Sequence, residues 1–185
     1  MKRNLLLLFV IVSFIMLSAC NFNEIENPPG EETPTEEINV NKIPDFEGTD
    51  LYGNTVTQEI FYDFSLTMVN IWGTFCNPCI EEMPDLAQLH QEILNEDINI
   101  VGILVDVSEE NNKDFAIEIT ESYNVEFTNI IPDDNLLDYL SEILVGVPTS
   151  LFIDKEGNII GEPVIGARGK DDYKQIIFQR VEEFE

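Results

Sequence analysis

The sequence predicts an α/β domain whose central, mostly parallel sheet is covered by helices on both faces. Two apolar runs, residues 66–72 and 98–105, are nearly continuous, as in strands that are buried on both sides. Each is followed by a segment with helical spacing of apolar residues, at 78–94 and at 109–123. Because parallel strands need a crossover connection, this alternation of strand and helix predicts a parallel core.

Shorter elements are expected on either side of this core. Residues 43–56 are predicted to form a hairpin that turns near Gly53 and Asn54, with a brief helix following at 58–63. Beyond the second long helix we expect a strand at 127–131, a short helix at 134–140, strands at 149–154 and 158–164 around a turn at Gly157, and an amphipathic helix at 170–183. The predicted domain therefore spans residues 43–185.

The N-terminus has the features of an export signal. Lys2 and Arg3 precede an apolar run at 5–17, which is shorter than the roughly 20 residues of a membrane-spanning helix. Residues 17–20, Leu-Ser-Ala-Cys, resemble a bacterial lipobox. We therefore expect residues 1–19 to be a signal peptide and Cys20 to carry a lipid on the outer face of the bacterial cell membrane. An uncleaved helical anchor is the alternative, and both interpretations place the domain outside the cytoplasm.

The segment from Cys20 to residue 42 is predicted to be a disordered acidic tether. It contains several prolines and glutamates and few large apolar residues, so it cannot bury enough surface to fold. The whole chain has 36 acidic and 9 basic residues, for a net charge of −27. This charge argues against nucleic acid as a partner and against electrostatic docking on anionic lipid. We interpret it as a solvated acidic surface, with a patch for a cationic partner as the alternative.

The motif that carries the chemistry is Cys-Asn-Pro-Cys at residues 76–79, where the strand at 66–72 gives way to a helix. Two cysteines at this spacing can form a disulfide with each other. The first turn of a helix has free N–H groups and the positive end of the helix dipole, and both stabilise a thiolate. We therefore expect Cys76 to be the nucleophile with a lowered pKa, and Cys79 to resolve the mixed disulfide that forms on Cys76.

Glu82 is the candidate proton carrier. Its spacing from Cys79, Leu86 and Leu89 places it on the apolar face of the helix, whereas Glu81 should point to solvent. A partly buried carboxyl has a raised pKa because desolvation disfavours its charge, and it could exchange a proton with Cys79. The alternative is that Glu82 reaches water and only interacts with the helix start.

These residues resemble the thioredoxin superfamily, and more closely its membrane-tethered TlpA/ResA-like branch, over about residues 43–184. The marks are Trp72 before the cysteine pair, Pro84 after it, and Gly-Val-Pro-Thr at residues 146–149. The resemblance implies a thioredoxin-like fold with an N-terminal hairpin and an inserted strand and helix in mid-domain. It also implies that Pro148 is cis and lies against the disulfide.

The resemblance extends to the residues of the site. Thioredoxins carry a buried aspartate where this chain has Asn70, whereas the TlpA/ResA-like branch has an acid at the position of Glu82. Phe75 replaces a tryptophan that many relatives carry. The implied catalytic residues are Cys76, Cys79, Glu82 and Pro148, and the implied substrate contacts are Trp72, Phe75, Asn77, Pro78 and Val147.

The activity that the resemblance implies is thiol–disulfide exchange outside the cytoplasm, in which the chain reduces protein disulfides. A membrane thiol transporter would supply the electrons. The candidate clients are the haem-motif cysteines of apocytochrome c, during cytochrome c maturation, and a methionine sulfoxide reductase. We expect a monomer that needs no cofactor beyond the disulfide between Cys76 and Cys79.

Three other interpretations compete with this one. Structural zinc needs four Cys or His ligands, but the chain has three cysteines, one of them Cys20, and one histidine, so no metal is expected. A peroxiredoxin-like peroxidase would carry a threonine where this chain has Gly73. A lipoprotein that only binds a ligand on a thioredoxin-like scaffold would keep an inert disulfide, so reducibility separates it from an oxidoreductase.

Overall fold

The structure, a computed structural model, describes residues 39–108 and 110–182. These residues form a mixed sheet of seven strands in the order β2-β1-β5-β4-β3-β6-β7. The central strands β3, β4 and β5 are parallel, and the outer strands pair in antiparallel fashion. The strands are β1 Glu47–Asp50, β2 Thr55–Thr57, β3 Leu66–Trp72, β4 Ile98–Leu104, β5 Asn129–Ile131, β6 Thr149–Asp154 and β7 Val164–Ile165.

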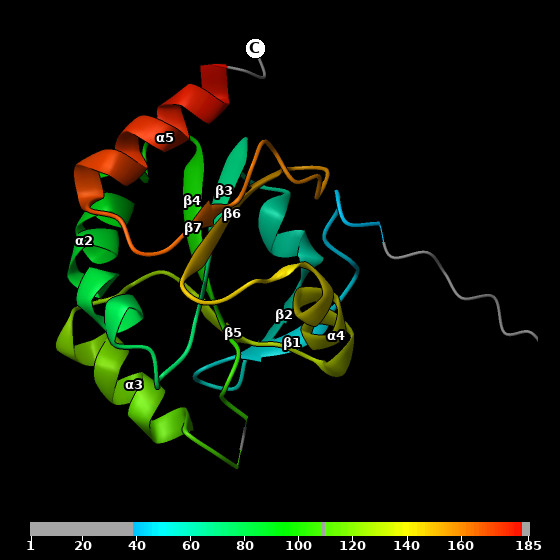
Figure 1. The fold of residues 1–185 in the computed structure, drawn as a ribbon, viewed down its shortest axis with the longest axis vertical. Helices are drawn as coiled ribbons and strands as arrows, with labels where there is room; N and C mark the ends of the chain where they lie inside the picture. The colour runs from blue at the N-terminus through cyan, green and yellow to red at the C-terminus, as the bar shows by residue number, and fades with distance from the viewer. Residues whose placement is uncertain (1–38, 109, 183–185) are drawn as a thin grey trace, which may run out of the picture. The chain divides into compact units, whose positions relative to one another are not determined.

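Helices cover both faces of this sheet, as the sequence predicts (Figure 1). Alternate residues of β3 point to opposite sides, so Met68 packs in the cluster under α2, α3 and α5, and Val69 in the cluster under η1 and α4. Both sides of β3 are buried, which explains its continuous apolar run. The helices are η1 Gln58–Phe61, α2 Asn77–Ile93, α3 Lys113–Ser122, α4 Asp134–Ile143 and α5 Lys170–Glu182. None of these described helices is long and apolar enough to cross a membrane.

The predicted signal peptide, Cys20 and most of the predicted tether lie outside the described residues. The last residues of the tether are described, and they contact the domain. The backbone carbonyl of Asn41 accepts a hydrogen bond from the Ile159 N–H at 2.9 Å, and Lys42 forms a β-bridge with Asn158. Contacts with the folded domain therefore begin slightly before residue 43.

The helix expected over 109–123 begins later, at Lys113. Asn112 adopts a left-handed backbone conformation with φ of 59°, which a helix cannot continue through. Its side chain instead donates a hydrogen bond to the carbonyl of Asp106 at 2.9 Å. A local hydrogen bond of this kind competes with helix formation.

The strand expected over 158–164 is wrong. Asn158 and Ile159 form only isolated bridges after the turn at Gly157. Gly161 then adopts a positive φ of 64°, which takes the backbone out of the extended conformation. Pairing with β6 resumes only in the two-residue strand β7.

The carboxyl ends of β3 and β4 place the active-site loop. Trp72 and Leu104 are partners in the parallel register, and the Val105 N–H donates to the Trp72 carbonyl at 3.0 Å. The loops that leave the two strands therefore lie side by side, and α2 begins at this edge of the sheet. Open α/β sheets form their functional sites at such an edge.

Candidate active site

Cys76 and Cys79 form a disulfide at the start of α2, with their Cα atoms 5.3 Å apart. Cys76 is the N-cap residue, and the backbone N–H of Cys79 donates to its sulfur at 3.3 Å. Cys76 is 6% exposed, whereas Cys79 is completely buried. A group arriving from solution therefore reaches Cys76 first, and the helix start stabilises a thiolate at this position.

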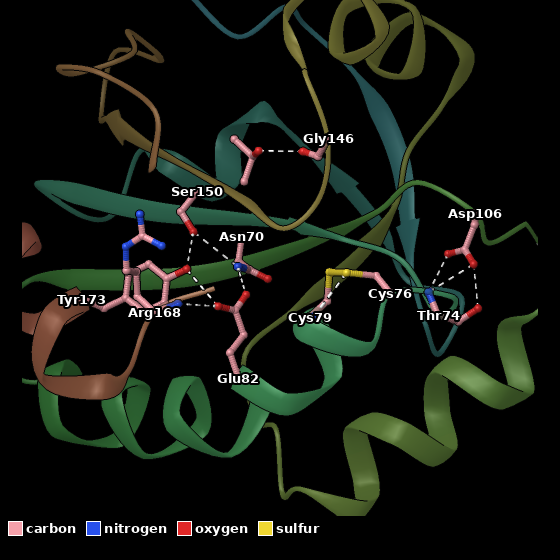
Figure 2. The surroundings of a disulfide bond; sticks show 11 residues. Asn70, Thr74, Cys76, Cys79, Glu82, Asp106, Gly146, Ser150, Arg168 and Tyr173 are labelled. Atoms are coloured by element: carbon pink, nitrogen blue, oxygen red, sulfur yellow. Dashed lines mark hydrogen bonds between the residues drawn. A yellow bond between two sulfur atoms is a disulfide. The ribbon is translucent and has the colours of Figure 1, made fainter. Parts of the chain in front are cut away.

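Glu82 lies on the buried face of α2 and is 3% exposed, whereas Glu81 is exposed, as their spacing predicts. One carboxylate oxygen of Glu82 accepts from the Asn70 amide at 2.9 Å. The other accepts from the Tyr173 hydroxyl and from the Arg168 backbone N–H, both at 3.1 Å (Figure 2). Burial raises the pKa of Glu82 above its ordinary value, and these hydrogen bonds oppose the rise in part.

A row of polar residues, with a glycine among them, crosses the middle of the sheet beneath α2. Asn129, Gly102, Asn70 and Ser150 are lateral neighbours on β5, β4, β3 and β6. The Asn70 amide also donates to the Ser150 hydroxyl at 3.3 Å, and Ser150 donates to the Tyr173 hydroxyl at 3.2 Å. Asn70 therefore reaches the Glu82 carboxylate both directly and through two hydroxyl groups.

Sequence reasoning identified Glu82 but missed Ser150 and Tyr173. The available signal was a polar residue inside an otherwise apolar strand, as at Asn70 and Ser150. A buried polar side chain needs a partner, so each such interruption predicts a hydrogen-bonded group on a covering helix.

The expectation that Trp72 contacts substrate is wrong. Its side chain is completely buried, and its indole N–H donates to the Asn129 side-chain oxygen at 2.9 Å. Trp72 faces the α2 side of β3, in the same core cluster as the two cysteines. Its position on the inward face of the strand excludes contact with a group in solution.

The other expected contact residues are accessible to different degrees. Phe75 is 67% exposed, Asn77 and Pro78 are exposed, and Val147 is half-buried. The peptide bond between Val147 and Pro148 is cis, as the resemblance implies, and Pro148 is buried.

An open groove of about 420 Å³ lies beside this surface. It is lined mainly by apolar side chains, with Phe75 from the cysteine loop, Val147 from the segment before β6, and Leu137 and Leu140 from α4. Phe75 is next in the chain to Cys76, and Val147 is next to Pro148. The groove is therefore adjacent to both the nucleophile and the cis-proline.

The surroundings of Gly73 argue against a peroxiredoxin-like peroxidase, which would carry a threonine at this position. A Cβ atom at this position would lie 2.7 Å from the Phe75 ring and 3.2 Å from a carboxylate oxygen of Asp106. The threonine of the peroxiredoxin pattern would therefore displace Phe75. Within the described residues, no group of three or more His, Cys, Asp or Glu side chains is arranged to hold a metal ion.

The chemistry that this arrangement serves is dithiol–disulfide exchange. The slightly exposed Cys76 at the helix start can act as the nucleophile, and the completely buried Cys79 one turn later can act as the resolving thiol. The neighbouring carboxyl of Glu82, whose pKa is raised, can accept a proton. The class of protein is a thioredoxin-like thiol–disulfide oxidoreductase.

Comparison with known proteins gives the family. A sequence model of the AhpC/TSA family matches residues 40–161, and the chain belongs to that family. The thiol-disulfide oxidoreductase ResA of Bacillus cereus is 30% identical over 173 residues, which cover 92% of this chain and 94% of the relative.

Solved structures agree with this assignment. A thioredoxin-family thiol:disulfide interchange protein from Chlorobium tepidum superposes with a TM-score of 0.63 at 24% identity, covering 76% of this chain and 95% of that protein. The thioredoxin domain of a thiol-disulfide oxidoreductase from Bacteroides vulgatus gives a TM-score of 0.60 at 26% identity, covering 75% and 94%. The chain is similar to the ResA-like group in sequence and to thioredoxin-family proteins in fold.

Proposed function

We propose that the chain works as a reductant of protein disulfides, with Cys76 as the attacking thiolate and Cys79 as the resolving thiol. The observation that carries the proposal is the unequal exposure of the two cysteines, 6% for Cys76 and none for Cys79. The Cys76 thiolate attacks a client disulfide, forms a mixed disulfide and releases one client sulfur as a thiolate. Cys79 then attacks the Cys76 sulfur, which releases the second client sulfur and closes the Cys76–Cys79 disulfide.

Glu82 takes the proton that Cys79 must lose before it attacks. Cys79 is completely buried, so a base from solution does not reach it in this conformation. Glu82 follows one turn later on the same face of α2, and burial raises its pKa, which makes its carboxylate a better proton acceptor than that of an exposed glutamate. No cofactor besides the cysteine pair takes part in this scheme.

The groove between Phe75 and Val147 holds an extended segment of the client beside Cys76. Backbone pairing next to Pro148 gives broad, weak recognition, and the apolar lining accepts a large side chain near the client cysteine. Asn77 and Pro78 are exposed at the start of α2, where they can contact the same segment.

The site of action is the outer face of the bacterial cell membrane, with Cys20 lipidated and a membrane thiol transporter as electron donor. The support is the lipobox-like sequence at 17–20 and the resemblance to the membrane-tethered branch. The clients in this scheme are the haem-motif cysteines of apocytochrome c or a methionine sulfoxide reductase, and the protein acts as a monomer.

Trapping tests the division of labour between the cysteines. Cys79→Ser should accumulate a mixed disulfide between Cys76 and a client peptide, because no resolving thiol remains. Cys76→Ser should accumulate none, because Cys79 is buried. Trapping through Cys79 would refute the scheme. A reductant should have a reduction potential of about −220 mV or lower, and a value near about −120 mV, which is typical of strong oxidants, would also refute it.

Lipidation is tested separately in a bacterial host. Cys20→Ala should abolish incorporation of labelled fatty acid and change the processing of the precursor. If the variant stays membrane-bound at mature size, the anchor is a helix and Cys20 has another role.

A further inference from the structure

Asp106, which follows β4, holds the loop that carries Cys76. One of its carboxylate oxygens accepts from the Thr74 backbone N–H at 2.9 Å. The other accepts from the Thr74 hydroxyl at 2.6 Å and from the same N–H at 3.1 Å (Figure 2). Thr74 precedes Cys76 by two residues, and the Cys76 N–H donates to the Gly73 carbonyl at 3.1 Å in the same turn. The carboxylate therefore contacts the turn from which the nucleophile projects.

The sheet brings these two residues together. Trp72 and Leu104 are partners in the parallel register of β3 and β4, and Thr74 and Asp106 each lie two residues further along. Asp106 is held in turn by Asn112, whose amide donates to its backbone carbonyl at 2.9 Å. Asn112 immediately precedes α3, so this contact connects the start of α3 to the cysteine loop.

We propose that Asp106 is a positioning residue that acts on Cys76 through Thr74, and that its negative charge limits the stabilisation of the Cys76 thiolate. This inference rests on the proposed reductant function and deepens it. The carboxylate engages both Thr74 donors, which are then unavailable to a neighbouring thiolate. It also places a like charge near that thiolate, and both effects keep the Cys76 pKa from falling further.

The consequence for the redox couple follows from linkage. A thiolate that is less stabilised makes the dithiol form less stable, so the couple becomes more reducing. One pKa unit on the attacking thiol corresponds to at most about 30 mV in the two-electron potential. Asp106 would thus hold this exchange pair toward the reducing end of its range.

Other acids lie on the two helices that flank the cysteine loop and the groove. Glu82 and Glu81 lie further along α2, and Asp138 and Glu142 lie on α4, whose leucines line the groove. Asp106 differs from these four in accepting hydrogen bonds from the loop itself. A substitution at Asp106 can therefore remove the negative charge and still keep a hydrogen-bond acceptor for the loop.

The test measures the Cys76 pKa in the full chain carrying Cys79→Ser, from the pH dependence of iodoacetamide labelling mapped by mass spectrometry. Asp106→Asn keeps an acceptor oxygen but removes the charge, and should lower the Cys76 pKa by about half a unit. With both cysteines present, the same change should make the reduction potential less negative.

Thr74→Val removes the hydroxyl donor but keeps the carboxylate and the side-chain shape. It should leave the Cys76 pKa unchanged or raise it, and Thr74→Ser, which keeps the hydroxyl donor, should have the wild-type value. General loosening of the loop would instead move the pKa in the same direction in Asp106→Asn and Thr74→Val. The matched charge control is Asp63→Asn, an exposed aspartate near the opposite end of β3, which should have no effect.

An unchanged Cys76 pKa in Asp106→Asn would overturn the proposal, and so would a lowered pKa in Thr74→Val. The second result decides the matter even if Asp106→Asn does not fold. These pKa measurements need no client, so failure to reduce clients would refute the proposed function without touching the role of Asp106.

Discussion

At the scale of single residues, Glu82 is a carboxyl group that is buried yet has three hydrogen-bond donors. Asn70 provides one of them, while its own side-chain oxygen is buried without a partner. A protonated Glu82 could donate to that oxygen if the Asn70 amide turned over. The pair can thus serve both protonation states of the carboxyl, which suits a group that exchanges a proton during catalysis.

Glu82→Gln should change how stability depends on pH. Burial raises the folded-state pKa of Glu82 above its ordinary value of 4.5. As the pH rises, the folded protein therefore keeps this proton to a higher pH than the unfolded chain does. Wild type should therefore lose stability relative to Glu82→Gln as the pH rises from about 4.5 through the raised pKa. The loss should approach about 1.4 kcal/mol for each unit of the pKa shift. Urea unfolding of both oxidised proteins, repeated at steps of about one pH unit between pH 4 and 8, measures this loss of stability.

Glu81→Gln is the control, because Glu81 is the neighbouring acid on α2 and is exposed. Its stability difference from wild type should not vary with pH in this way. Parallel stability curves for wild type and Glu82→Gln would contradict the raised pKa.

At the scale of elements, a hydrogen bond joins Trp72 on β3 to Asn129 on β5 and passes over Gly102 on β4, the strand between them. The indole of Trp72 needs the Asn129 oxygen, and that oxygen occupies the space beside Gly102. A Cβ atom at Gly102 would lie 2.0 Å from it, which is far inside van der Waals contact. The glycine in β4 therefore makes room for a hydrogen bond between the strands on either side.

Gly102→Ala should destabilise the protein by about 1–3 kcal/mol, because the added methyl group overpacks a buried position beside Asn129. Asn129→Ala should cost a similar amount, since it leaves a buried indole N–H without an acceptor. In the Asn129→Ala background the cost of Gly102→Ala should fall by at least about 1 kcal/mol, because the clashing oxygen is gone. Chemical denaturation of the four proteins of this cycle measures the coupling.

Gly146→Ala is the matched control, because a Cβ atom there meets nothing within 4 Å. It should change the free energy of unfolding little. Additive costs for Gly102→Ala and Asn129→Ala would show that the two positions do not compete for the same space.

At the scale of the whole molecule, the dominant property is the net charge of −27. Part of the cationic charge is already engaged, since Lys170 and Lys174 both form ion pairs with Glu92. The resulting field should attract cationic clients and repel anionic ones, and salt should weaken both effects.

Reduction of a cysteine-disulfide peptide flanked by lysines should therefore slow several-fold as salt rises from about 0.02 to about 0.3 M. The same peptide flanked by glutamates should be reduced faster as salt rises, and a neutral peptide should be nearly indifferent. Stopped-flow measurement of the second-order rate constants gives the three salt slopes. Equal slopes for the cationic and anionic peptides would exclude a steering role for the charge.

The sequence by itself determined the features that depend on local periodicity. The buried strands at 66–72 and 149–154, the helix that begins at the cysteine pair, and the inward position of Glu82 follow from apolar spacing along short segments. The strand expected over 158–164 failed because a positive φ at Gly161 interrupts it, and local apolar content does not report that backbone turn.

Only the tertiary structure decided the partners of the polar side chains. Trp72 and Asn129 are 57 residues apart in sequence, and Glu82 and Tyr173 are 91 apart. Each contact depends on the register between strands and on which helix covers which face. These are set by packing of the whole sheet, so no short segment of sequence specifies them. Asp106 meets Thr74 for the same reason, because two parallel strands end side by side.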